Sequence, residues 1–182
     1  ELLVSQVNRC NEILKKLSIN STLEDDFIDK DLKLNNYLKE IVSSFKEISD
    51  KNFILNTEQD YNSFDIKKSI EIIYGIRNFV GNANKYAKKN IYISIKSDSE
   101  TSEIIIEDDG PGFSKDILTK IGTPYIKSLR TKDNQKAGLG LGIFIGKTLL
   151  EKNYAKILFR NSETRGGAEI KIEWENKNLI KI

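Results

Sequence analysis

The amino-acid sequence predicts an α+β fold, a two-layer α/β sandwich in which helices cover one face of a mixed, mostly antiparallel sheet. Two pairs of short segments rich in β-branched residues indicate this. Residues 90–97 and 102–108 are joined by a Ser/Asp/Glu turn, and residues 155–162 and 166–174 are joined across a Gly-Gly pair. Each pair is expected to form a hairpin. Because these adjacent antiparallel strands are mixed with helices, we expect a sheet covered on one face and not a doubly wound parallel sheet.

The remaining elements follow from local composition. The 182 residues are enough for one domain, or for a domain with an appended element. Polar residues at 20–26 predict a linker or a turn. After it we expect, in chain order, a strand near 27–32, a helix at 34–49, a strand at 52–59, a long helix at 65–88, the first hairpin, a short helix at 114–121, a polar loop at 122–137, a helix at 139–153 and the second hairpin.

Residues 2–18 have the pattern of an amphipathic helix with a heptad seam. The apolar residues of the seam recur at alternating spacings of four and three: Leu3, Val7, Cys10, Leu14 and Leu17. Two interpretations remain open from the residues alone. The seam packs against partner helices of a bundle, or the helix lies on its own domain.

Composition excludes several classes of function. The chain has no histidine, so it cannot contain a Ser-His-Asp triad or a His-ligated metal. Its 29 Lys and Arg residues nearly balance 27 Asp and Glu residues, which argues against nucleic-acid binding. One cysteine cannot form an internal disulfide. Neither a run of about 18 apolar residues nor a leader occurs, so we expect no membrane contact by this chain.

The chain also lacks Met, and we expect it to be a piece of a longer protein.

The long helix predicted at 65–88 carries a polar stripe. Asn78, Asn82 and Lys85 are spaced four and three residues apart, so they share one face. An Asn amide oxygen is a ligand for Mg²⁺ and a Lys ammonium binds phosphate, although a solvated polar face is the alternative. The apolar residues of the other side are expected to face the sheet: Ile66, Ile70, Ile73, Val80, Ala83 and Ala87.

Two glycine motifs follow. Asp108-x-Gly110-x-Gly112 ends a strand, where glycines allow a flat ligand to approach the backbone and the carboxylate can accept from an exocyclic amine. Taken alone, this motif is more often a turn. Gly138-Leu139-Gly140-Leu141-Gly142 opens a helix and directs N–H groups toward an anion, unless it is only a tight loop–helix junction. The basic, polar stretch 123–136 between them is either disordered or functional, and in the functional interpretation it forms a lid over phosphates.

The order and spacing of these motifs closely resemble the N, G1 and G2 boxes of the ATP-binding domain of sensor histidine kinases, which has the Bergerat (GHKL) ATPase fold. The segments SQVNRCNEIL, IGTPYIKS, GLGLGIFIGKTLLE and GGAEIKIEW resemble the RegB/PrrB group of redox-responsive two-component sensor kinases. The resemblance implies that residues 1–19 end the second helix of a dimerisation domain, 20–31 form a linker and first strand, 32–175 form the catalytic ATP-binding domain and 176–182 form a C-terminal tail.

The resemblance implies a site for ATP and Mg²⁺. In it Asn82 would ligate Mg²⁺, Lys85 would contact phosphate, Tyr86 would lie along the adenine or ribose, and Asp108 would bind the adenine amine. The implied ATP-binding set is Asn78, Asn82, Lys85, Tyr86, Asp108, Gly110, Gly112, Arg130, Gly138, Leu139, Gly140, Leu141 and Gly142.

Cys10, residues 123–125 and Ala168 lie outside the three boxes. Cys10 lies in a stretch similar to the redox-active cysteine region of the RegB group, although a small packing residue is the simpler interpretation. The aromatic-x-Pro-Phe box found before the lid in the family is replaced by Thr123-Pro124-Tyr125. Ala168 replaces the threonine that many of these kinases carry after the last glycine, which removes a hydroxyl near the base.

Position 78 distinguishes a kinase from a hydrolytic ATPase. Members of the superfamily that hydrolyse ATP carry a glutamate there that activates water, whereas Asn78 cannot accept a proton. We therefore expect a protein-histidine kinase domain whose γ-phosphate goes to a histidine upstream of Glu1 and then to an Asp of a response regulator. The chain lacks that histidine and cannot autophosphorylate.

The resemblance also implies partners and a location. The partners are the protein's own dimerisation domain, a second protomer and a receiver domain, and the location is the cytoplasmic part of a bacterial inner-membrane sensor kinase. The alternative is a nucleotide-binding regulator of the anti-sigma-factor/serine-kinase type on the same fold. A degenerate scaffold is disfavoured by the intact Asn82, Asp108 and glycines.

Overall fold

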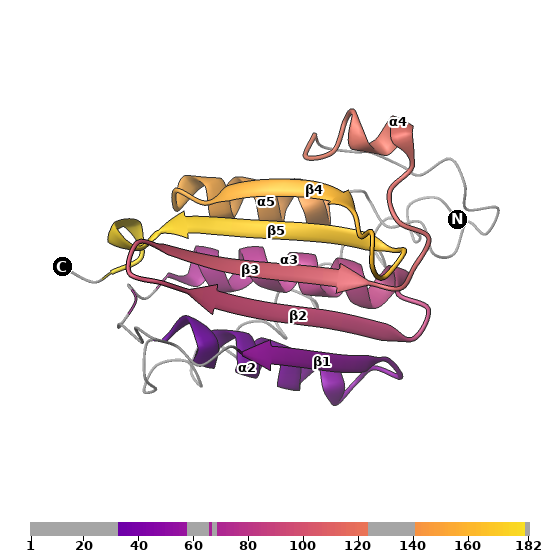
Figure 1. Cartoon of the computed structure of the whole chain (residues 1–182), viewed down its shortest axis with the longest axis horizontal. Coiled ribbons are helices and arrows are strands. Elements are labelled where there is room, and N and C mark those ends of the chain that lie inside the picture. The colour runs from indigo at the N-terminus through magenta and orange to yellow at the C-terminus, as the bar shows by residue number, and fades with distance from the viewer. Residues whose placement is uncertain (1–32, 58–65, 67–68, 124–140, 181–182) are drawn as a thin grey trace, which may run out of the picture. The chain divides into compact units, whose positions relative to one another are not determined.

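A computed structural model describes residues 33–57, 66, 69–123 and 141–180. Its strands form one sheet in the order β1-β2-β3-β5-β4 (Figure 1). The strands are β1 (Asn52–Thr57), β2 (Asn90–Ser97), β3 (Thr101–Asp108), β4 (Lys156–Asn161) and β5 (Ala168–Glu175). β1 is parallel to β2 and all the other neighbouring pairs are antiparallel. The mixed, mostly antiparallel sheet and both predicted hairpins are therefore confirmed.

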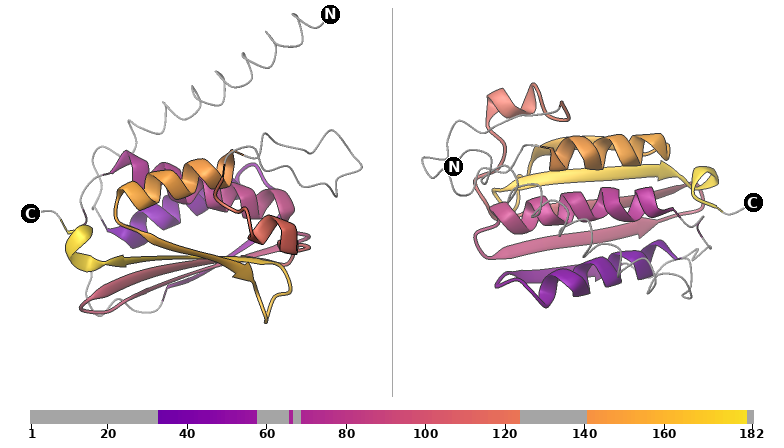
Figure 2. Two further views of the ribbon diagram at one scale, coloured as in Figure 1. Left: turned by 90° about the horizontal axis from the view of Figure 1, so that it is seen from above. Right: turned by 180° about the vertical axis from the view of Figure 1, so that it is seen from behind.

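The helices form a second layer on one face of the sheet, as Figure 2 shows in its left view. The long ones are α2 (Leu34–Lys46), α3 (Ile70–Tyr86) and α5 (Gly142–Lys152), while α4 (Lys115–Leu118) and the 3-10 helix η1 (Asn176–Asn178) are short. The predicted two-layer sandwich is confirmed. Among the described residues, no helix has the length and apolar character needed to cross a membrane.

Alternation along the strands explains why only one face is covered. The apolar strand residues that face the helices are almost completely buried: Ile91, Ile93, Ile95, Ile104, Ile106, Ile170, Ile172 and Trp174. The opposite face carries ion pairs, including Lys171 with Glu103 and Glu173 and Arg160 with Glu169. Because this face carries paired charged groups in place of apolar side chains, it needs no helical layer.

The long helix differs from its prediction at its start. It begins at Ile70, and the side chain of its N-cap Ser69 accepts a hydrogen bond from the Ile72 amide at 3.2 Å. Ile66 instead forms an isolated antiparallel bridge with Ile180. The expectation that Ile70 faces the sheet is wrong, since it is 46% exposed while Ile72 is buried. Side chains two residues apart on a helix of 3.6 residues per turn point in nearly opposite directions.

Residues after β5 pack against the first hairpin. Asn176 is buried; its Oδ1 accepts from Ser102 Oγ at 2.7 Å and its Nδ2 donates to the Asp98 carbonyl oxygen at 2.8 Å. Leu179 is also buried. The beginning of the segment expected to be a tail therefore joins β5 to the turn between β2 and β3.

We predict that Asn176→Ala lowers the free energy of unfolding by about 2 kcal/mol, because it leaves buried polar groups without partners. Urea unfolding followed by the fluorescence of Trp174, the single tryptophan, measures this. Asn178→Ala is the control, since Asn178 lies in the same turn and is half-buried without a side-chain hydrogen bond to the described residues. Equal midpoints for the two variants would contradict the prediction.

Candidate functional site

The C-terminal half of α3, the end of β3 and the start of α5 meet at one end of the sheet (Figure 1). Close packing of α3 on α5 determines this arrangement. A methyl group added at Gly146 would lie 2.7 Å from a ring carbon of Phe79 and 3.1 Å from the carbonyl oxygen of Gly75. A methyl group at Gly142 would lie 3.7 Å from Asn78 Oδ1. The polar stripe of α3 therefore begins beside the first residue of α5.

The polar stripe offers amide and ammonium groups to a ligand. Asn78 Nδ2 donates to the Tyr74 carbonyl oxygen at 2.8 Å, which fixes the amide and turns its oxygen toward α5. Asn82 is half-buried and makes no side-chain hydrogen bond to the described residues. Lys85 Nζ lies 5.0 Å from the ring centroid of Tyr86, which is 38% exposed. Asn82 and Lys85 can therefore bind a ligand without breaking a hydrogen bond within the described structure.

Asp108 is the buried carboxylate of the site, with 3% of its surface exposed. Its Oδ1 accepts from the Gly110 amide at 2.8 Å and from the Ala168 amide at 3.2 Å. Burial raises the pKa of Asp108, the two amides oppose that rise, and the charge of Asp109 adds to it. No described residue donates to Oδ2, so this oxygen can accept a hydrogen bond from a ligand.

Two glycines make room around this carboxylate. A methyl group at Gly110 would overlap the Tyr86 carbonyl oxygen and lie 2.7 Å from Asp108 Oδ1. A methyl group at Gly167 would overlap the backbone oxygen of Asp108 and its Oδ1. The site therefore requires glycine at both positions, and Gly167 was not among the predicted site residues.

Asn161, at the end of β4, was also missed by sequence reasoning. Its Oδ1 accepts from the Phe113 amide at 2.6 Å and its Nδ2 donates to the Phe113 carbonyl oxygen at 3.0 Å. The Phe113 ring packs edge-on against Phe159 with centroids 6.3 Å apart, and Phe159 packs likewise against Phe79 at 5.7 Å. Asn161 thus anchors the loop that follows Gly112, whose φ of 69° is left-handed.

The start of α5 is arranged for an anion. Leu141 is its N-cap, and no side chain caps the amides of the first turn. Backbone N–H groups at a helix N-terminus attract negative charge. Of the predicted G2 residues, the structure describes Leu141 and Gly142 here. Outside the described residues lie Gly138, Leu139, Gly140, Arg130, Cys10, Pro124 and Tyr125.

No group of three or more His, Cys, Asp or Glu side chains suited to a metal occurs in the described part of the chain. A metal at this site would therefore take few ligands from the residues that the structure describes. Mg²⁺ suits this arrangement, because it binds through one or two protein oxygens together with water and substrate phosphates. The free amide of Asn82 can supply such an oxygen.

The fold and the site together define a nucleotide-binding domain of the GHKL class. Residues 68–178 match the family model described as "Histidine kinase-, DNA gyrase B-, and HSP90-like ATPase". The chain belongs to this family, and the matched residues are its ATP-binding domain, of the type found in sensor histidine kinases.

A curated relative and two solved structures agree with this assignment. The chain is 29% identical over 203 residues to the sensor histidine kinase RegB of Cereibacter sphaeroides, and the match covers 100% of the chain and 43% of RegB. The chain therefore spans less than half of that relative. The nucleotide-free catalytic domain of the histidine kinase ThkA superposes with a TM-score of 0.65 at 21% identity, covering 79% of this chain and 95% of that one.

Full-length ShkA in complex with AMPPNP superposes with a TM-score of 0.66 at 15% identity, covering 84% of this chain and 31% of ShkA. At these identities the two structures show a shared fold. The similarity to RegB agrees with the expected RegB-like group, and the matched family agrees with the expected ATP-binding domain.

Proposed function

We propose that the chain is the catalytic part of a two-component sensor histidine kinase, which binds Mg-ATP and presents the γ-phosphate to a histidine upstream of Glu1. The observation that carries this proposal is Asn78. Its side chain occupies the junction of α3 and α5, and its Nδ2 is held by the Tyr74 carbonyl oxygen. An amide in this position cannot take a proton from water, so the bound phosphoryl group is reserved for another nucleophile.

The protein groups have distinct tasks in this proposal. Asp108 Oδ2 accepts from the exocyclic amine of adenine, while Gly110 and Gly167 let the backbone pack closely around this carboxylate. The amide oxygen of Asn82 would hold Mg²⁺, and the ion would supply positive charge to the phosphates. Lys85 and the N–H groups at the start of α5 bind phosphate oxygens. This set binds and orients the nucleotide, which is most of what a phosphotransferase domain must do.

The rest of the parent protein follows from the same proposal. RegB aligns with the whole chain, residues 1–31 included, which supports assigning residues 1–19 to the end of a dimerisation domain. A second protomer and the receiver domain of a response regulator would then be partners, and the domain would work on the cytoplasmic side of a bacterial membrane. Residues 32–175 would be the catalytic domain, and Cys10 would lie in the dimerisation helix.

The test is to compare hydrolysis with transfer. The purified chain is incubated with radiolabelled ATP and Mg²⁺, alone and with a separately produced segment of the parent protein that contains the upstream histidine. We expect only slow phosphate release from the chain alone, and labelling of the histidine segment when both are present. Rapid hydrolysis by the chain alone would contradict the proposal, as would an unlabelled histidine segment.

A further inference from the structure

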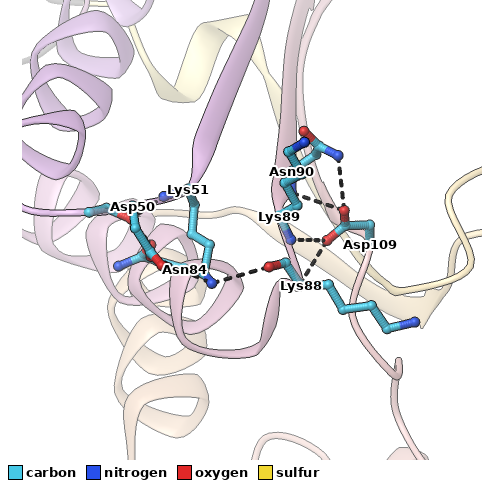
Figure 3. A network of polar contacts seen from close by, with 8 residues as sticks. Asp50, Lys51, Asn84, Lys88, Lys89, Asn90 and Asp109 are labelled. Carbon is cyan, nitrogen blue, oxygen red and sulfur yellow. Dashed lines mark hydrogen bonds and ion pairs between the residues drawn. The ribbon is translucent and has the colours of Figure 1, made fainter.

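Asp109, the residue directly after β3, holds four hydrogen bonds that no nucleotide contact explains. Its Oδ1 accepts from the amides of Lys88 and Lys89 at 2.8 and 2.9 Å. Its Oδ2 accepts from the amide of Asn90 at 2.9 Å and from Asn90 Nδ2 at 3.0 Å. Figure 3 shows the carboxylate facing these three consecutive residues. One side chain thus binds the whole connection between α3 and β2.

These amides need a partner because the chain leaves the helix just before them. Ala87, the C-cap of α3, has a ψ of 142° and is extended. The amides that follow can therefore no longer bond to carbonyl groups of the helix. Burial would raise the pKa of Asp109, but the hydrogen bonds from the amides of Lys89, Asn90 and Lys88 outweigh it and lower the pKa. The ionised carboxylate is therefore the form that accepts these bonds.

A second contact holds the same helix end from the other side (Figure 3). Lys51 Nζ donates to the Lys88 carbonyl oxygen at 3.1 Å, and Ser49 Oγ donates to Asn84 Oδ1 at 2.6 Å. These bonds tie α3 to the segment before β1. The bonds of Asp109, by contrast, tie the end of α3 to the loop that contains Asp108, the buried carboxylate of the site.

The position of Asp109 between Asp108 and Gly110 gives its bonds a consequence for the site. The Cα of Gly110 lies so close to the Tyr86 carbonyl oxygen that a methyl group there would overlap it. The Gly110 amide in turn holds Asp108 Oδ1. The placement of the Asp108 carboxylate therefore depends on how the end of α3 meets this loop.

We propose that Asp109 is a positioning residue for nucleotide binding: it keeps the end of α3, with Asn82 and Lys85, in register with the loop that presents Asp108. The inference rests on the proposed function of the site. Asp109 itself does not touch the nucleotide in this account. It acts through the connection at residues 88–90 and through the contact of Gly110 with Tyr86.

The test uses a matched carboxylate at the opposite end of the same hairpin. Asp98 accepts from the amides of Glu100 and Thr101 at 2.8 and 2.7 Å, and its pKa is also lowered by backbone hydrogen bonds. Asp109→Ala and Asp98→Ala each remove a carboxylate that binds backbone amides in a turn. Similar losses of stability are therefore expected, while only one of the two variants should affect the site.

Two quantities are measured for the full chain and both variants: the Kd for an ATP analogue with Mg²⁺, and the hydrogen-exchange protection of the Gly110 amide. We expect Asp109→Ala to weaken binding by about tenfold or more, because displaced binding groups lose affinity steeply. It should also lower the protection of Gly110, whereas Asp98→Ala should change neither quantity. Asp109→Asn keeps one acceptor oxygen, so its Kd and its Gly110 protection should lie between those of the original chain and Asp109→Ala. It replaces Asp109→Ala in the test if that variant does not fold.

The exchange measurement separates this inference from the proposed function. Loss of Gly110 protection in Asp109→Ala supports the positioning role whether or not the chain binds the analogue. Absence of binding by the unmodified chain would count against the proposed function alone. Unchanged Gly110 protection in Asp109→Ala, or equal loss of affinity in Asp98→Ala, would overturn the inference.

Discussion

Replacing Gly167 by alanine is expected to abolish nucleotide binding and to lower the free energy of unfolding by about 3 kcal/mol, the upper end of the range for overpacking. The new methyl group would overlap the backbone oxygen and Oδ1 of Asp108, and both are buried. Asp108 ends β3, Gly167 directly precedes β5, and the two strands pair up to Glu107 and Glu169, so neither segment can move away without disturbing the sheet. The displaced group would be the carboxylate that we assign to the base.

The neighbouring glycine provides the control. A methyl group at Gly166 meets no atom within 4 Å, and its φ of 78° is the one feature that opposes alanine there. Gly166→Ala is therefore expected to cost about 1 kcal/mol of backbone strain and to leave binding unchanged. Urea unfolding and titration with an ATP analogue measure both effects. A Gly167→Ala protein as stable as Gly166→Ala would refute the close approach of β3 and β5 at this point.

Asp108→Asn is expected to weaken binding of an adenine nucleotide by about 100-fold, the value of a lost charge-assisted hydrogen bond. The substitution keeps Oδ1, which accepts from Gly110 and Ala168, and replaces Oδ2 by an NH₂ group. Two donors would then face each other, the amine of adenine and the new amide. Titrations with ATP and with a purine nucleotide that lacks the exocyclic amine distinguish this cause from general damage, since only ATP should lose affinity.

The same substitution should not destabilise the fold at neutral pH. Burial raises the pKa of Asp108 above its ordinary value of 3.8. A carboxyl group with a raised pKa binds its proton more tightly in the folded state, so stability falls as the pH rises from the ordinary pKa through the raised one. Asparagine cannot ionise and avoids this loss. Thermal unfolding should therefore show Asp108→Asn at least as stable as the original chain at pH 7. Any advantage should vanish below about pH 3, where Asp108 is protonated in the folded and the unfolded state alike. A much less stable variant would mean that Asp108 is structural.

Local patterns in the sequence predicted most of the fold. Alternating β-branched residues in 90–97 and 102–108 determine both the strands and the buried face, so the hairpin and the core follow from adjacent residues. The start of α3 was predicted too early because Ile66 fits the helical period. In the structure Ser69 caps the helix and Ile66 pairs with Ile180 instead of extending the helix. Ile180 lies more than a hundred residues further along the chain, so the helical period could not reveal this pairing.

The candidate site was predictable where its residues are contiguous. Asn78, Asn82 and Lys85 share a helix face, and Asp108 with Gly110 is one turn, so spacing brings them together. The residues that hold this turn were missed, because their partners are distant in sequence. Asn161 meets Phe113 across 48 positions, and Gly167 approaches Asp108 just beyond the last paired residues of β3 and β5, Glu107 and Glu169. Nothing in a single sequence marks such a contact before the sheet order is known.

Titration of the chain with a non-hydrolysable ATP analogue, with and without Mg²⁺, tests the central claim most directly. The variants to compare are Asn82→Ala and, as a control, Asn84→Ala, whose side chain lies on the same helix but bonds to Ser49. We predict that Mg²⁺ strengthens binding to the original chain and to Asn84→Ala, and that Asn82→Ala loses this enhancement. No binding by the original chain, or the same Mg²⁺ dependence in Asn82→Ala, would contradict the assignment of this site.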